Sequence, residues 1–180
     1  MTGRQMALGA LSMHSIIDVE ASGFGAGSYP IEVGTAMADG RSYCSLISPE
    51  PGWKHWEPGA EGVHGITRCT LLAHGKPAAT VARHLNECLH GQTVYTDAWY
   101  HDYQWLARLY DAADMQPSFQ LQDLRRLLSE AAMARWHPTR EQVTQELQLN
   151  RHRASNDARV LQQTLHRVMA TPPTPPAPPT

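Results

Sequence analysis

Cysteine is scarce in this sequence, with Cys44, Cys69 and Cys88 as the only three among 180 residues. Their number is odd and no Cys-x-x-Cys pair occurs, which argues against a disulfide framework and against a cysteine zinc site. No apolar run approaches the ~18 residues that a membrane-spanning helix needs, so no membrane partner is expected. These absences predict reduced thiols and a cytoplasmic protein.

The sequence also lacks a large excess of either sign of charge, because 15 Lys and Arg against 17 Asp and Glu leave a net charge of −2. A strongly basic body that holds nucleic acid by charge alone is therefore excluded, and any nucleic-acid site must be local. The composition is 42% hydrophobic and 18% charged, which argues against a disordered chain. The length favours one domain, two at most.

The two ends of the sequence differ from its body. Residues 1–12 are expected to be a flexible leader, and they make a poor signal peptide because Ile16 and Ile17 continue into a charged strand. Residues 171–180 hold six of the thirteen prolines, which predicts a disordered tail, with a docking ligand for a partner as the alternative. The folded domain is expected to span residues 13–170.

Short apolar runs and period-two alternation predict strands, and the Asp39-Gly40 turn joins two of them as a hairpin. Three consecutive strands, followed by two that alternate with helices, predict an α/β fold with a mixed five-stranded sheet flanked by helices. The predicted strands span residues 14–19, 30–38, 41–48, 92–96 and 117–119. Residues 49–65 are expected to form a loop. A first helix is predicted to begin near Thr67, and further helices are predicted over residues 78–89, 99–113, 121–136, 139–149 and 155–169.

Asp18 and Glu20 stand two residues apart on the first predicted strand, so both carboxylates project from one face. Two carboxylates at the end of an apolar strand repel each other unless cations neutralise them. Oxygen-only ligands favour a hard ion such as Mg²⁺ or Mn²⁺. The pair therefore indicates either a metal site or a solvated strand end.

Two further acidic segments follow along the chain. Asp97 and Asp102 stand where the fourth predicted strand leads into a helix, and Asp97 also suits a helix N-cap. His152 precedes the last predicted helix, and Asp157 lies five residues further on, where a carboxylate also pairs favourably with the helix dipole. Each segment taken alone has an ordinary structural explanation.

Taken together, the three segments resemble a known family. The order Asp-x-Glu, then an acidic residue before a Trp-Leu pair, then His-x-x-x-x-Asp resembles the DEDDh (DnaQ-like) subgroup of the DEDD 3′→5′ exonucleases, whose fold is ribonuclease H-like. Local matches are residues 30–34 (Pro-Ile-Glu-Val-Gly), 63–67 (Val-His-Gly-Ile-Thr) and 152–154 (His-Arg-Ala). The resemblance covers residues 13 to 168.

The resemblance implies a catalytic site. Asp18, Glu20, Asp102 and Asp157 would hold two divalent cations, Mg²⁺ or Mn²⁺, and His152 would be the general base that deprotonates the attacking water. The family usually has Asn where this sequence has Asp97, and the spacing to the Trp-Leu pair favours Asp102 over Asp97 as the metal ligand. The other residues expected to bind substrate are Ala21, Ser22, Gly23, Phe24, His64, Ile66, Asp97 and Trp99.

The implied activity is hydrolysis of phosphodiester bonds at the 3′ end of single-stranded DNA or RNA, with release of nucleoside 5′-monophosphates. Backbone groups of residues 21–24 would contact the 3′ hydroxyl, and Phe24 or Ile66 would wedge beside the last base. Trp99 would either stack on a base or pack against the core. Members of the family are often homodimers, although this sequence carries no dimer signature.

Two alternatives differ in function class. A non-catalytic member of the same fold would bind nucleic acid or protein, but it would have no reason to keep paired carboxylates facing phosphate. A small-molecule hydrolase or a hydroxylase that uses a His/carboxylate triad with iron would need His64 or His101 to converge with His152, which the spacing does not suggest.

Overall fold

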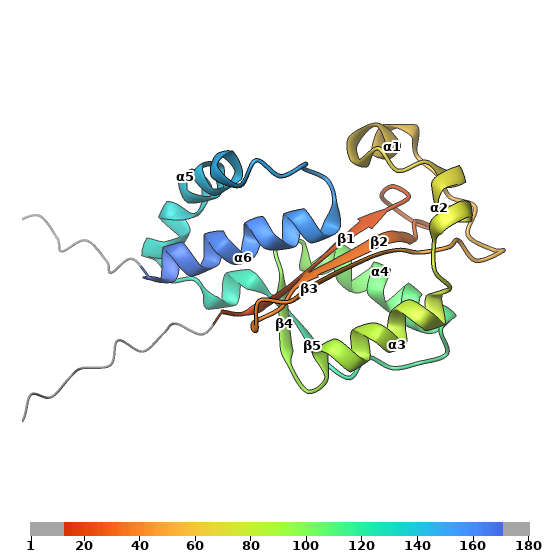
Figure 1. The fold of residues 1–180 in the computed structure, drawn as a ribbon, viewed down its shortest axis with the longest axis horizontal. Coiled ribbons are helices and arrows are strands. Elements are labelled where there is room, and N and C mark those ends of the chain that lie inside the picture. Colours follow the sequence, from red (N-terminus) through yellow and green to blue (C-terminus); the bar gives the residue numbers. More distant parts are fainter. Residues whose placement is uncertain (1–12, 171–180) are drawn as a thin grey trace, which may run out of the picture.

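The structure, a computed structural model, describes residues 13–170. The predicted leader (1–12) and tail (171–180) lie outside the described residues. A five-stranded sheet with strand order β3-β2-β1-β4-β5 forms the centre of the molecule (Figure 1). The strands are β1 (Ser15–Ala21), β2 (Pro30–Ala36), β3 (Ser42–Leu46), β4 (Thr93–Thr96) and β5 (Gln120–Asp123). The β1–β2 and β2–β3 pairs are antiparallel and the β1–β4 and β4–β5 pairs parallel, which confirms the predicted mixed sheet.

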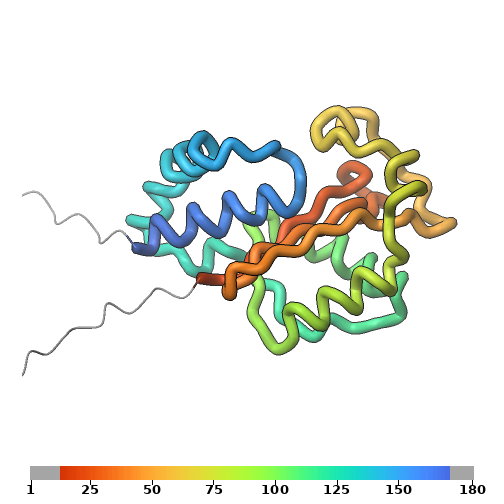
Figure 2. Tube along the Cα trace, in the orientation of Figure 1, coloured from red at the N-terminus to blue at the C-terminus, as the bar shows by residue number. Residues whose placement is uncertain are grey.

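Helices cover both faces of this sheet. Figures 1 and 2 show α5 and α6 on one side and α3 and α4 on the other. No helix between residues 13 and 170 is long and apolar enough to cross a membrane. The helices are α1 (Pro58–His64), α2 (Arg68–His74), α3 (Ala78–Leu89), α4 (Trp99–Ala112), α5 (Glu130–Leu147) and α6 (Ala154–Ala170).

The alternation of side chains along β1 decides where its carboxylates point. Ile17 and Val19 belong to the core that includes side chains of α3 and α4, whereas Ile16 belongs to a second core with α5 and α6. Because successive strand residues point to opposite faces, Asp18 and Glu20 share the face of Ile16. The acidic pair therefore projects from the face of the sheet that α6 covers.

Gly34 of β2 lets the beginning of α6 approach this face closely. A Cβ atom at Gly34 would lie 2.0 Å from the backbone nitrogen of Ser155 and 2.2 Å from the carbonyl carbon of Ala154. Only a residue without a side chain fits between the strand and the helix there. The contact brings the first turn of α6, which carries Asp157, over the sheet beside β1.

Three predicted elements differ from the structure. Residues 58–64, expected as loop, form α1, in which Pro58 occupies the first turn and the C-cap Gly65 has a positive φ of 69°. The fifth strand is predicted at residues 117–119 but lies at residues 120–123. Residues 120–123 are the ones that pair in parallel with β4. The helix predicted over 121–136 is therefore wrong over its first half.

The sequence predicts two helices separated at Pro138. In the structure, Pro138 lies inside the continuous helix α5. A proline in a helix removes one backbone hydrogen bond. Trp136 and Val143, on either side of it, are buried, and Trp136 packs in the core that α5 shares with α6. This packing offsets the missing hydrogen bond.

Candidate active site

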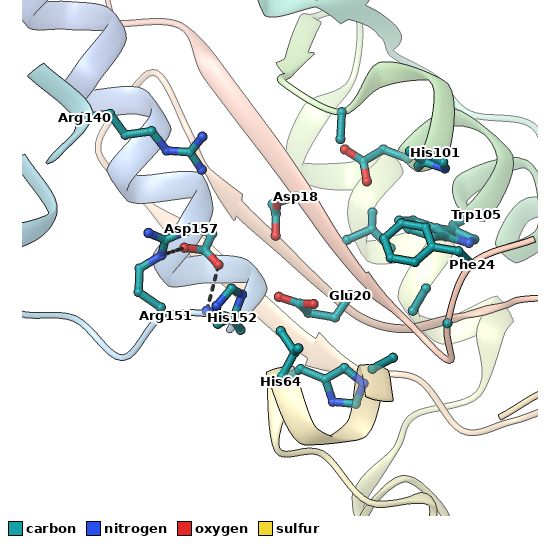
Figure 3. Close-up of a pocket in the computed structure, with 17 residues that line it drawn as sticks. Asp18, Glu20, Phe24, His64, His101, Trp105, Arg140, Arg151, His152 and Asp157 are labelled. Atoms are coloured by element: carbon teal, nitrogen blue, oxygen red, sulfur yellow. Dashed lines mark hydrogen bonds and ion pairs between the residues drawn. The ribbon is translucent and has the colours of Figure 1, made fainter. Parts of the chain in front are cut away.

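A cleft of about 340 Å³ opens at the end of β1, between α1, α4 and the beginning of α6. Figure 3 shows Asp18, Glu20 and Asp157 turned toward this common space, with His152 beside them. The residues that line the cleft are Asp18, Val19, Glu20, Ala21, Gly23, Phe24, Ala60, Val63, His64, Ala98, His101, Asp102, Trp105, Arg140, Arg151, His152 and Asp157.

Three elements bring the acidic side chains together. Asp18 and Glu20 project from one face of β1, and Asp157 reaches the same space from the first turn of α6. Asp102 comes from the first turn of α4, which follows β4, the parallel neighbour of β1. The structure thus brings all four sequence-predicted metal ligands into one cleft, although 139 positions separate the first from the last.

Burial and mutual repulsion disturb the protonation of these carboxyls. Burial, followed by the negative charges of Asp102 and Glu20, raises the pKa of Asp18 well above its ordinary value. Burial raises the pKa of Asp102 to about 8, although the Thr96 hydroxyl donates a hydrogen bond to its carboxylate. Burial and the charge of Asp157 raise the pKa of Glu20 to about 7. Nearby cations would reverse every one of these shifts.

The carboxylate of Asp157 ties down the loop before α6. Its Oδ1 accepts a hydrogen bond of 2.7 Å from Nε of Arg151, and its Oδ2 accepts one of 2.8 Å from the backbone N–H of His152. His152 has a φ of 59°, in the left-handed region, and its side chain is exposed. Ligand atoms of Glu20, His152 and Asp157 lie within 4.8 Å of one another, so the imidazole stands at the edge of the acidic cluster.

The carboxylate of Glu32 on β2 also anchors the segment at the beginning of α6. It is fully buried and accepts hydrogen bonds from Nε and Nη2 of Arg153 and from the backbone N–H of Ala154. Cys44 adds a thiol contact of 3.4 Å. In the sequence, Glu32 stands out only as part of a local match. Its signal is a charged residue in the middle of an otherwise uncharged strand.

Aromatic side chains form the wall of the cleft opposite Arg140 and Arg151 (Figure 3). Phe24 is 61% exposed and meets the ring of His101 edge-on at 5.2 Å. His101 in turn stacks on Trp105 at 5.6 Å with an interplanar angle of 25°. A nucleobase-sized ring would find stacking partners on this wall.

Four of the eight residues predicted to bind substrate line the cleft, namely Ala21, Gly23, Phe24 and His64. His64 is buried, its Nδ1 accepts a hydrogen bond of 3.0 Å from the backbone N–H of Ile66, and burial lowers its pKa. The imidazole of His64 is therefore neutral.

Ser22, Ile66 and Trp99, also predicted to bind substrate, lie outside the cleft lining. The hydroxyl of Ser22 is buried and accepts a hydrogen bond from the backbone N–H of Tyr29, and Ile66 belongs to the core. Trp99 stacks on Tyr103 and donates a hydrogen bond to a backbone carbonyl of β5. Each of these side chains already has a structural contact.

Asp97 also lies outside the lining, and it does not cap α4. Its carboxylate pairs with Arg140 at 3.1 Å, and the N-cap residue of α4 is Ala98, whose backbone N–H bonds to the Thr96 hydroxyl. The expected capping role is therefore wrong, because the long-range partner on α5 holds the carboxylate. Of the two candidates in this segment, Asp102 is the one that lines the cleft.

Arg140, which no sequence motif singles out, reaches the cleft from α5. It stands 122 positions from Asp18 and belongs to no local pattern of the sequence. Only the packing of α5 against α6 places it there. His101 is the other lining residue with a polar side chain that the sequence does not assign to the site.

These observations define the class of the domain, a ribonuclease H-like α/β fold with four carboxylates and a histidine in one cleft. The fold is similar to that of E. coli exonuclease I in complex with a dT13 oligonucleotide, with a TM-score of 0.67 and 15% identity over 88% of this chain and 41% of that chain. For the complex with a dA16 oligonucleotide the TM-score is 0.66, with 14% identity over 88% and 40%.

A zinc-bound form of the complex of the E. coli enzyme with single-stranded DNA gives a TM-score of 0.63, with 15% identity over 83% of this chain and 38% of that chain. The present chain thus spans about two fifths of the length of these solved structures. No protein-family model matches the sequence, and no curated protein matches it either. At such identities the likeness establishes the fold.

Proposed function

We propose that this domain is a metal-dependent 3′→5′ exonuclease that removes nucleoside 5′-monophosphates from the 3′ end of single-stranded DNA or RNA. The observation that carries the proposal is the convergence of Asp18, Glu20, Asp102 and Asp157 in one cleft beside His152. The similarity of the fold to exonuclease I structures that hold single-stranded oligonucleotides supports it.

The donor set fits hard divalent cations. Asp18, Glu20, Asp102 and Asp157 offer only carboxylate oxygens, which Mg²⁺ and Mn²⁺ favour, and these four side chains would hold two such ions. The raised pKa values of three of the four support the assignment, because they indicate a cluster short of positive charge. When bound, the ions would supply charge neutralisation at the phosphate and an activated water.

His152 is the proposed general base. Imidazole is the side chain best suited to take a proton from water close to neutral pH. The hydrogen bond from the backbone N–H of His152 to Asp157 holds the residue next to the acidic cluster. Its exposed ring borders the space where the attacking water would lie, so it can pass the proton on to solvent.

The terminal nucleotide would lie between the carboxylates and the aromatic wall. Phe24 would stack on the last base, a contact worth ~1–3 kcal/mol per base that tolerates any sequence. The backbone of Ala21 and Gly23, at the end of β1, would contact the 3′ hydroxyl. His64 is neutral and buried, so it would contribute shape and a hydrogen bond instead of charge.

The test uses single strands of DNA and of matched RNA that carry a label at the 5′ end. With Mg²⁺ or Mn²⁺ the label should appear in a ladder of strands shortened from the 3′ end, together with free 5′-monophosphates, and EDTA should stop the reaction. Asp18→Asn is the matched variant without activity. Binding without shortening would favour the non-catalytic alternative, and early loss of the label would contradict the direction of hydrolysis.

A further inference from the structure

Two arginines stand on the side of the cleft that faces the aromatic wall (Figure 3). Arg140 comes from α5 and Arg151 from the loop before α6, and both line the cleft that holds the carboxylates. Both also line a neighbouring outer hollow of about 400 Å³. They therefore mark the border at which the cleft continues into this outer hollow. The remaining residues of the outer hollow are His137, Glu141, Thr144 and Gln145.

Each arginine is held in place by one carboxylate. Arg140 donates one hydrogen bond, from Nη1 to Asp97, and Arg151 donates one, from Nε to Asp157. A guanidinium has five N–H donors arranged in a rigid planar fork. The two side chains are 27% and 37% exposed. Each arginine thus has a fixed position and further donors that a ligand in the hollow can reach.

The two sides of the cleft match the 3′ end of a nucleic-acid strand. Phe24, His101 and Trp105 form an aromatic wall on one side, and the arginines supply positive charge on the other, with the acidic cluster between them (Figure 3). At the 3′ end of a strand, likewise, the last base lies on one side of the scissile phosphate and the next backbone phosphate lies on the other. Planar guanidinium groups bind phosphate oxygens through charge-assisted pairs of hydrogen bonds.

The electrostatic balance of the outer hollow agrees with an anionic ligand. Among the residues that line it, Glu141 is the single acidic one, against Arg140 and Arg151. The main cleft has the opposite balance, with four carboxylates against the same two arginines. A polyanionic strand therefore meets its favourable protein charges on the arginine side.

We infer that Arg140 and Arg151 form a phosphate subsite that holds the backbone phosphate on the 5′ side of the scissile bond. This inference rests on the proposed function, because it takes the ligand to be a single nucleic-acid strand. The subsite would fix the direction in which the strand leaves the cleft, toward the outer hollow on α5. It would also bind phosphate without reading the base sequence.

The salt dependence of binding tests the subsite. The slope of log Kd against log salt concentration falls by about 0.7 for each phosphate of a single strand that the protein no longer neutralises. The probe is a short fluorescent single strand, bound to the full chain in Ca²⁺ in place of Mg²⁺, with the strand verified as intact afterwards. Arg140→Gln should weaken binding about tenfold and lower the slope by about 0.7. Arg140→Lys should keep the slope, because the charge remains.

Arg140 is the cleaner of the two probes, because its partner Asp97 does not line the cleft whereas Asp157 does. The double variant with Arg151→Gln should lower the slope by about 1.4. Arg159→Gln is the matched control, an exposed arginine on α6 that lines neither hollow, and should leave both affinity and slope unchanged.

The outcomes separate this inference from the proposed function. Equal slopes for the wild-type chain and Arg140→Gln would overturn the subsite alone, even if the affinity fell for structural reasons. Absence of any binding by the wild-type chain would overturn the proposed function as well. A nucleoside 5′-monophosphate carries the same phosphate chemistry, so thymidine 5′-monophosphate is titrated in parallel. Arg140→Gln should bind thymidine 5′-monophosphate as tightly as the wild-type chain does. Weaker binding of the monophosphate by this variant would assign Arg140 to the product phosphate and overturn its assignment to a phosphate of the strand.

Discussion

Arg153 and Glu32 form an ion pair of 2.6 Å in which the carboxylate has no exposed surface while the arginine side chain is 45% exposed. The same carboxylate accepts a hydrogen bond of 2.9 Å from the backbone N–H of Ala154, the first residue of α6. His152 and Asp157 lie one and four residues from Arg153. The pair therefore determines where the histidine and the last acidic residue meet the sheet.

The unequal burial of this pair predicts an unequal response to mutation. Arg153→Ala leaves a buried carboxylate without its cation and should lower the free energy of unfolding by about 3–5 kcal/mol. Glu32→Gln leaves a cation that can turn to solvent and keeps an oxygen for Ala154, so it should cost only about 1–2 kcal/mol. Urea unfolding at neutral pH measures both.

The exposed pair of Arg41 and Asp39 is the control, and Arg41→Ala should leave the unfolding midpoint unchanged. The double variant Glu32→Gln with Arg153→Ala should be more stable than Arg153→Ala alone, because it has no buried carboxylate without a cation. A larger destabilisation by Glu32→Gln than by Arg153→Ala would contradict the role given to burial.

Gly34→Ala should disturb the approach of α6 to β2. The added Cβ would meet backbone atoms of Ala154 and Ser155, which cannot rotate away as a flexible side chain can. We expect a decrease of about 1–3 kcal/mol in the free energy of unfolding and, if the protein folds, weaker metal binding through the displaced Asp157. Gly52→Ala, where a Cβ meets nothing within 4 Å, is the matched control. Equal stability of the two variants would show that α6 is not positioned by this contact.

The acidic cluster predicts that the metal-free protein loses stability as the pH rises. Burial raises the pKa of Glu20 to about 7 and that of Asp102 to about 8, above the values of about 4 that carboxyls have in an unfolded chain. Between about pH 5 and pH 8 the folded state therefore binds more protons than the unfolded state, and the free energy of unfolding falls with increasing pH. Thermal melting in EDTA across this range measures the fall.

Asp102→Asn serves as the control for this pH dependence, because its side chain carries no proton to lose. Its melting temperature should fall less steeply between pH 5 and pH 8 and should exceed that of the wild-type chain at pH 8. Mg²⁺ should raise the melting temperature of the wild-type chain more at pH 8 than at pH 5. A flat or rising profile of the metal-free wild-type chain would be inconsistent with the raised pKa values.

His152→Ala should reduce kcat by about 10²–10⁴-fold while the affinity for Mn²⁺ stays close to that of the wild-type chain. The reason is that the proposed role of the imidazole is proton transfer, whereas carboxylates hold the ions. Single-turnover kinetics together with Mn²⁺ titration separate the two effects. Loss of Mn²⁺ binding in the variant would make His152 a ligand and its assignment as the base wrong.

The parts of this fold that local patterns specify were predictable. The first three strands follow from alternation and from the Asp39-Gly40 turn, and the last helix follows from its apolar periodicity. The position of β5 and the continuity of α5 through Pro138 depend on partners distant in sequence, so local propensity misplaced both.

The candidate site divides in the same way. The four carboxylates and His152 belong to motifs with characteristic spacing and could be named before the fold was known. Arg140 and the anchoring role of Glu32 could not, because each acts through a partner that folding brings close: Asp97 for Arg140, and Arg153 for Glu32. The sequence likewise favours Asp97 as a cap for α4, because its partner Arg140 is distant along the chain.

The most direct test of the central claim is a count of bound Mn²⁺ by electron paramagnetic resonance, with a short single strand present in Ca²⁺-free buffer at a temperature that halts turnover. We expect saturable binding of two Mn²⁺ per chain, loss of binding in Asp18→Asn, and unchanged binding in Asp39→Asn, whose carboxylate lies in the exposed β2–β3 turn. Absence of saturable binding, or equal binding by the wild-type chain and Asp18→Asn, would contradict the claim that these carboxylates form a metal centre.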